Sequence, residues 1–117
     1  MVDTGIRNFM QGYRDADQGR MLENMVYLQL LYDGYDVAVG KLRSGEVDFV
    51  ATKAQERLYV QVTEDMTAPG TMQREIAPLR AIRDAYPKTV IAARGSYPAD
   101  IDGITIRTAA DFLLHRR

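Results

Sequence analysis

The chain has 117 residues, of which 46% are hydrophobic, and its formal net charge is −1. This length predicts a single domain spanning residues 1–117 that buries roughly two-thirds of its unfolded surface. The near-neutral charge excludes a global basic field for nucleic acid, and the absence of cysteine excludes disulfides and thiolate zinc sites. The single histidine, His115, excludes a histidine-based metal cluster.

No apolar run approaches the ~18 residues of a membrane-spanning helix, and no signal peptide opens the sequence. We therefore expect a cytoplasmic protein without a membrane partner. The chain begins abruptly, because residues 2–5 resemble the end of a strand that enters a turn and residues 6–13 could form only a short helix. This start leads us to expect the C-terminal fragment of a longer protein.

Residues 17–33 form the first predicted helix, with Asp17 as N-cap and Gly34 as the glycine that follows the last turn. Glu23 lies within its apolar residues, so we expect the Glu23 carboxylate at the rim of the core, in a polar pocket, or at an edge that reaches solvent. Apolar residues surround this helix almost completely, which predicts burial on most sides and tyrosines that line the core. They are Met21, Leu22, Met25, Val26, Leu28, Leu30 and Leu31, with Tyr27 and Tyr32.

Three short strands follow the helix, over residues 35–41, 46–51 and 57–63. In each of them Val, Phe, Leu or Tyr alternates with smaller or polar residues, and short turns separate them. The pattern predicts an antiparallel meander.

A second hairpin that turns at residues 54–55 would set Val50 opposite Tyr59 and Asp48 opposite Gln61. One face of the sheet would then carry a polar cluster with the Asp48 carboxylate at its centre. The other face would be apolar and pack on the core, and its members are Val47, Phe49, Leu58, Val60 and Val62.

The second half of the chain predicts a helix over residues 71–86, which Pro78 should kink or restart. An interior strand over 89–93, a short strand over 104–107 and a last helix over 109–114, capped by Thr108, complete the order. This order predicts an α/β (α+β) sandwich with a mixed sheet. The second helix would be the right-handed crossover to one parallel strand.

Glu23, Asp48 and Gln61 are the polar residues that this arrangement would bring together. Aspartate is disfavoured in mid-strand, so Asp48 is expected either to carry chemistry or to form a buried hydrogen bond with Gln61 or Tyr59. Magnesium prefers about six oxygen ligands and retains waters, so two carboxylates and a backbone carbonyl could hold it. Phosphodiester hydrolysis needs such a cluster and a positive group near the phosphate.

The order of elements and the motifs of residues 46–49 (EVDF) and 59–63 (YVQVT) resemble the PD-(D/E)XK nuclease superfamily. In that superfamily a helix carries a glutamate, one strand an aspartate, and the next strand (D/E)-x-Lys. Further matching segments are residues 3–8, 22–27, 34–37, 39–41, 74–79, 86–88 and 111–114. Together they resemble the C-terminal domain of a large family of predicted prokaryotic AAA+ ATPases, over nearly the whole chain.

The resemblance implies a restriction-endonuclease-like αβββαβ core with a small C-terminal strand and helix, following an ATPase module in the parent protein. It places Glu23, Asp48 and Gln61 at the metal-site positions and implies magnesium as cofactor. Thr63 stands where the lysine should be, and a threonine hydroxyl neither orients a water nor neutralises phosphate charge as lysine does. Gln61 offers only a neutral oxygen, so we expect a degenerate site. The chain lacks a Gly-x-x-x-x-Gly-Lys-Ser/Thr loop and therefore an ATP site.

Two cationic residues could compensate for the missing lysine. Lys41 ends the first strand and would share the polar face if it pairs opposite Glu46, whereas Lys53 lies further off and both could be solvated. Arg74 and Glu75 open the second predicted helix, where they could contact phosphate, pair with Asp48 or form a surface salt bridge.

Three hypotheses follow. The first is a nuclease-like domain that has lost activity and binds DNA or a partner for its ATPase module. The second is an active magnesium-dependent endonuclease that uses Glu23, Asp48, the Val62 carbonyl and a displaced Lys41. The third is a dimerisation or scaffold domain with a purely structural polar face, which would make the protein a homo-oligomer. The missing lysine favours the first hypothesis.

Overall fold

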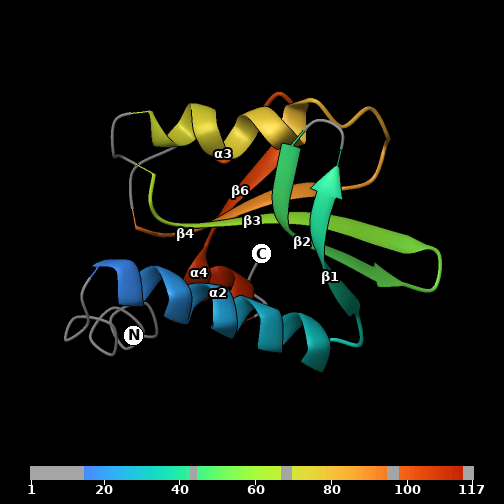
Figure 1. Cartoon of the computed structure of the whole chain (residues 1–117), viewed down its shortest axis with the longest axis horizontal. Helices are drawn as coiled ribbons and strands as arrows, with labels where there is room; N and C mark the ends of the chain where they lie inside the picture. The colour runs from blue at the N-terminus through green and yellow to red at the C-terminus, as the bar shows by residue number, and fades with distance from the viewer. Residues whose placement is uncertain (1–14, 43–44, 67–69, 95–97, 115–117) are drawn as a thin grey trace.

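The computed structural model describes residues 15–42, 45–66, 70–94 and 98–114 (Figure 1). The strand end and the short helix expected within residues 2–13 lie outside this part. The described elements are α2 (Asp15–Tyr32), β1 (Asp36–Leu42), β2 (Gly45–Lys53), β3 (Glu56–Asp65), α3 (Thr71–Arg80), β4 (Lys88–Arg94), β5 (Asp100–Ile101), β6 (Ile104–Thr108) and α4 (Ala109–Leu113).

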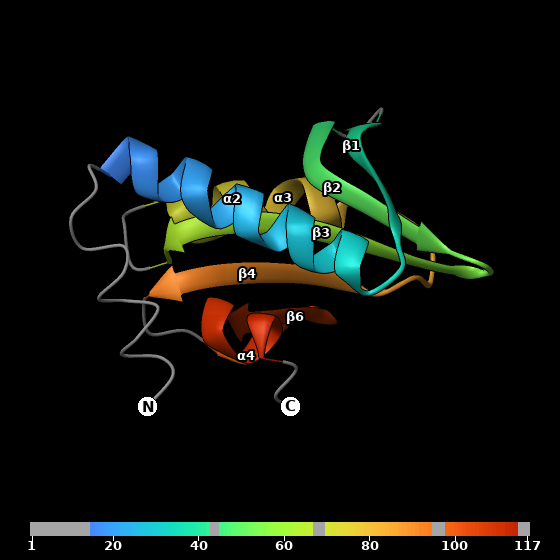
Figure 2. The ribbon, with the colours of Figure 1, turned by 90° about the horizontal axis from the view of Figure 1, so that it is seen from below.

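The six strands form one mixed sheet in the order β1-β2-β3-β4-β6-β5. The meander β1-β2-β3 is antiparallel, and α3 connects β3 to the parallel strand β4, as predicted. The pairing of β4 with β6 is also parallel, and β5 was not expected from the sequence. Helices α2 and α4 cover one face of the sheet and α3 covers the other (Figures 1 and 2). The mixed α/β fold class is therefore confirmed, and its order of elements is compatible with a nuclease-like core.

The registers of the two hairpins determine which residues of β1 and β3 lie opposite those of β2. In the second hairpin Val50 pairs with Tyr59, as predicted. In the first hairpin Lys41 pairs with Glu46, as predicted, and a β-bulge between Ala38 and Gly40 then shifts the register.

Two hydrophobic cores lie on opposite faces of the sheet. The core under α2 and α4 contains Leu22, Val26, Leu30, Ala51, Val60, Val62, Ile91, Ala109 and Phe112. The core under α3 contains Val47, Tyr59, Met66, Ile76, Leu79, Val90, Ala92, Ile104 and Ile106. The predicted apolar face of β3 is confirmed for Val60 and Val62.

The face predicted for Val47 is wrong, because this side chain packs under α3 while Phe49 packs against the α2 core. The alternation of β2 breaks at Asp48, where the strand separates from β3, and the Cα pairing of the two strands ends at Phe49 and Val60. The face expected to be polar also contains the apolar core under α3, and Gln61 is a buried polar residue of β3 on that face.

Helix α2 ends as predicted, since Gly34 adopts a φ of 96° that favours glycine. The Gly34 N–H donates to Leu31 O at 3.0 Å and the Tyr35 N–H donates to Leu30 O at 3.0 Å, which is a Schellman motif. The expectation that α2 is buried on most sides is wrong, because its outward side, including Leu28 and Tyr32, is exposed. Only the side that faces the sheet is covered by described residues.

Helix α3 ends at Arg80, shorter than predicted, and Pro78 occupies its last turn. Proline has no N–H, so Pro78 cannot donate to the backbone oxygen of Arg74 one turn earlier, whereas the Ala81 N–H still donates to Ala77 O at 3.2 Å. Thr108 caps α4 as predicted, because its Oγ1 accepts a hydrogen bond from the Asp111 N–H at 3.0 Å.

Candidate functional site

Asp48 lies where β2 and β3 separate, and side chains replace backbone hydrogen bonds there. The Val62 N–H donates to Asp48 Oδ2 at 2.8 Å, and the Asp48 N–H donates to Gln61 Oε1 at 2.8 Å. We call Asp48, Gln61 and Val62 the β2–β3 notch. Two of the residues at the predicted metal positions thus hold the two strands together at their point of divergence.

Gln61 is 5% exposed and uses both ends of its amide. Its Oε1 accepts from Asp48, and its Nε2 donates to the backbone oxygen of Glu75 in α3 at 3.3 Å. This side chain therefore joins β2, β3 and α3. A buried amide with both groups satisfied stabilises the fold, whereas leaving either group unpaired would cost about 1–3 kcal/mol.

Three carboxyl groups from three elements interact electrostatically around the notch. Burial, and then the charge of Asp48, raise the pKa of Glu23 in α2. Burial also raises the pKa of Asp48, against the hydrogen bond from Val62 that lowers it. Burial raises the pKa of Glu75 to about 7, helped by the charges of Asp48 and Glu23 and opposed by Arg74. The structure therefore brings Glu23 and Asp48 within electrostatic range and adds Glu75.

The role of Glu75 was missed at the level of sequence, where this residue was considered only as a phosphate contact or a salt-bridge partner. One sequence signal could have found it, because Glu75 is the only acidic residue between positions 71 and 83. An isolated acid beside the buried Ile76 is a candidate for an inward-facing carboxyl group.

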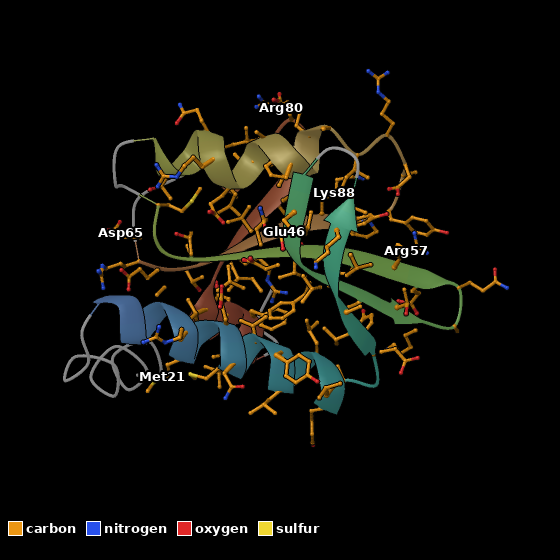
Figure 3. All side chains as sticks on the ribbon, in the orientation of Figure 1. Met21, Glu46, Arg57, Asp65, Arg80 and Lys88 are labelled. Atoms are coloured by element: carbon orange, nitrogen blue, oxygen red, sulfur yellow. The ribbon has the colours of Figure 1, made fainter. Side chains whose placement is uncertain are left out.

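Of the three cationic residues considered from the sequence, Arg74 is the one whose charge acts on one of these carboxyl groups, that of Glu75. Lys41 is exposed opposite Glu46, which Figure 3 shows at the start of β2, and among the described residues it forms no ion pair with Asp48. Lys53 donates from Nζ to Asp33 O at 2.9 Å and lies over the Tyr35 ring, so it ties α2 to the sheet. Arg74 donates to Thr71 Oγ1 at 3.1 Å, at the start of α3.

The donor set does not fit magnesium well. No group of three or more Asp, Glu, His or Cys side chains in the described ranges is arranged to hold a metal ion. The Val62 C=O shares the side of its N–H and points into the notch. However, one Asp48 oxygen and the Gln61 oxygen already accept backbone N–H groups. Thr63, at the lysine position, is half-buried in β3 and brings no charge.

A separate hollow of about 340 Å³ lies between the end of α3, the start of β4 and the turn before β6. Its lining includes Leu79, Tyr86, Lys88 and Ile104, and it shares no residue with the β2–β3 notch. We assign the candidate site to the notch, because Asp48 and Gln61, two of the residues predicted to form the site, lie there.

The fold and the notch define a mixed α/β domain in which the Asp48 and Gln61 side chains form internal hydrogen bonds. No family model matches the chain. Over 114 residues it is 40% identical to an uncharacterized protein of Haemophilus influenzae (strain Rd), a match that covers 97% of this chain and 28% of that protein. The chain thus spans about a quarter of the length of this relative. Within the described residues no helix is long and apolar enough to cross a membrane.

Proposed function

We propose that this chain is a nuclease-like domain without catalytic activity that acts as an interaction module within a longer polypeptide. The observation that supports this most directly is the bonding of the β2–β3 notch. The Asp48 carboxylate and the Gln61 amide, at two motif positions, bind backbone N–H and C=O groups of β2, β3 and α3. Residues with these roles maintain structure, and hydrolysis would require them to face a metal and substrate.

The charges around the notch also favour an inactive domain. Phosphodiester hydrolysis develops negative charge that a catalytic site must stabilise with a cation. Thr63 provides none, Lys41 is exposed opposite Glu46, and Arg74 only partly offsets the rise in the pKa of Glu75. Three mutually repelling carboxyl groups would instead repel a phosphate.

The proposal includes an ATPase module as the neighbour in the parent polypeptide, on the strength of the motif resemblance. The length of the Haemophilus influenzae relative supports a place within a larger protein, because most of that protein lies outside the matched segment. DNA as a ligand and a cytoplasmic location belong to the same proposal.

A plasmid-nicking assay with magnesium or manganese tests the proposal, with Asp48→Ala as the matched control. We expect the 117-residue chain to nick no more DNA than Asp48→Ala does, and calorimetric titration with either metal to give no saturable heat. Metal-dependent nicking that Asp48→Ala abolishes would overturn the proposal in favour of an active endonuclease. Metal-independent DNA retention that weakens steeply with salt would identify nucleic acid as the ligand.

A further inference from the structure

The outward side of α2 carries an uncharged, largely apolar stripe. Tyr27, Leu28, Leu31 and Tyr32, which we call the α2 outer face, are 36%, 53%, 41% and 85% exposed. Figures 1 and 2 show α2 as the outermost layer on its side of the sheet. Single exposed apolar residues are common on protein surfaces, but a contiguous group on one helix face marks an interaction site.

The two sides of α2 resemble each other in composition. Leu22, Val26 and Leu30 face the sheet and are fully buried in its core. On the outward side Leu28, Leu31 and Tyr32 recur at helical spacing of three and four residues. A helix that is apolar on both sides is typical of a position between two packed layers, and the described residues supply only one layer.

Two observations indicate what covers the α2 outer face: the spacing of its apolar residues, and the share of the relative that this chain matches. A stripe of residues at i, i+3 and i+4 is as wide as the seam that one further helix fills. The Haemophilus influenzae relative contains a segment 40% identical to this chain within a polypeptide of which that segment is 28%. Such a domain therefore has a large covalently linked neighbour in that protein.

We propose that the α2 outer face docks against an apolar helix from the remainder of such a longer polypeptide. This inference rests on the proposed function, since it names the surface through which the interaction module contacts its neighbour. The contact is apolar and covers Leu28, Leu31 and Tyr32, which are exposed and are not members of the β2–β3 notch.

Thiol labelling tests the contact, because the chain contains no cysteine and Leu31→Cys would introduce a single thiol. Gln55→Cys is the matched control, in the exposed turn between β2 and β3. The same two aligned positions are changed in the full-length Haemophilus influenzae protein, in a background without other cysteines. We expect similar maleimide rates at both positions in the 117-residue chain. In the full-length protein the maleimide rate at the position aligned with Leu31 should fall by about tenfold or more. The rate at the control position should be unchanged.

Equal labelling rates at the position aligned with Leu31 in the isolated and full-length proteins would overturn the proposal. Sedimentation of the 117-residue chain adds a second measurement, with a monomer expected at micromolar concentration. A dimer that Leu31→Lys dissociates would assign the face to a second copy and also overturn it. Nicking of DNA by the chain would refute the inactive-module proposal without changing the labelling rates, so the two failures are distinguishable.

Discussion

Replacing Glu75 by glutamine removes one of three mutually repelling carboxyl groups while keeping the size of the side chain. The folded protein holds the Glu75 proton more tightly than the unfolded chain, because the pKa rises from 4.5 to about 7. An acid whose pKa is raised on folding contributes stability while it is protonated. For Glu75 this contribution is fully present below pH 4.5 and is lost as the pH rises through about 7. The shift corresponds to about 3 kcal/mol, and solvent screening of this half-buried group reduces the effect to roughly 1–2 kcal/mol.

Glu75→Gln should therefore raise the free energy of unfolding by roughly 1–2 kcal/mol at pH 8 and leave it nearly unchanged at pH 4. Urea denaturation followed by circular dichroism at both pH values measures the difference. Glu56→Gln is the matched control, because Glu56 is exposed at the turn between β2 and β3. Equal stabilities of Glu75→Gln and the parent chain at pH 8, or a gain as large at pH 4, would refute the reasoning.

Five further substitutions at four positions test the notch, the bulge and α2 by thermal or urea denaturation. Gln61→Leu leaves the Asp48 N–H without its acceptor and should lower the free energy of unfolding by about 1–3 kcal/mol; an unchanged midpoint would contradict this. Asp48→Ala should cost a similar amount, but Asp48→Asn less, because the amide oxygen still accepts from Val62; equal losses would count against that bond. Gly40→Ala would place a Cβ 2.7 Å from Val50 Cγ2 and 3.1 Å from Val47 O, and should cost about 1–3 kcal/mol. Gly19→Ala in α2, with open space around it, should instead stabilise by about 0.5–1 kcal/mol, and the same sign for both glycines would be inconsistent with this packing.

The sequence predicts most of the fold because the strands, turns and caps are encoded locally. The pairing of Val50 with Tyr59 and the Gly34 helix end follow from alternation and from a residue that tolerates positive φ. The side of Val47 does not follow, because alternation assumes a regular strand. The break at Asp48 depends on hydrogen bonds to residues of β3 that lie more than ten positions away along the chain.

The candidate site was predictable as a set of residues but not as a set of bonds. Composition and motif spacing select Glu23, Asp48 and Gln61, whereas the direction of the Gln61 amide depends on where α3 lies. The contact of Gln61 with the Glu75 backbone and the charge of Glu75 near the notch arise only when the helix has packed on the sheet. Pattern analysis within one element contains no information on such packing.

The β-bulge between Ala38 and Gly40 has a consequence for how this sheet behaves in a concentrated solution. Strand β1 is the last strand on its side of the described sheet, and an open strand edge is a template for fibril growth. The extra residue of the bulge lies in β2, since three residue steps from Val47 to Val50 face two from Gly40 to Ala38, and a bulge bends and twists the strands around it. The exposed Lys41 adds a charge close to this bend. A bend at this edge with a lysine beside it therefore disfavours the pairing of β1 with a second copy of the chain.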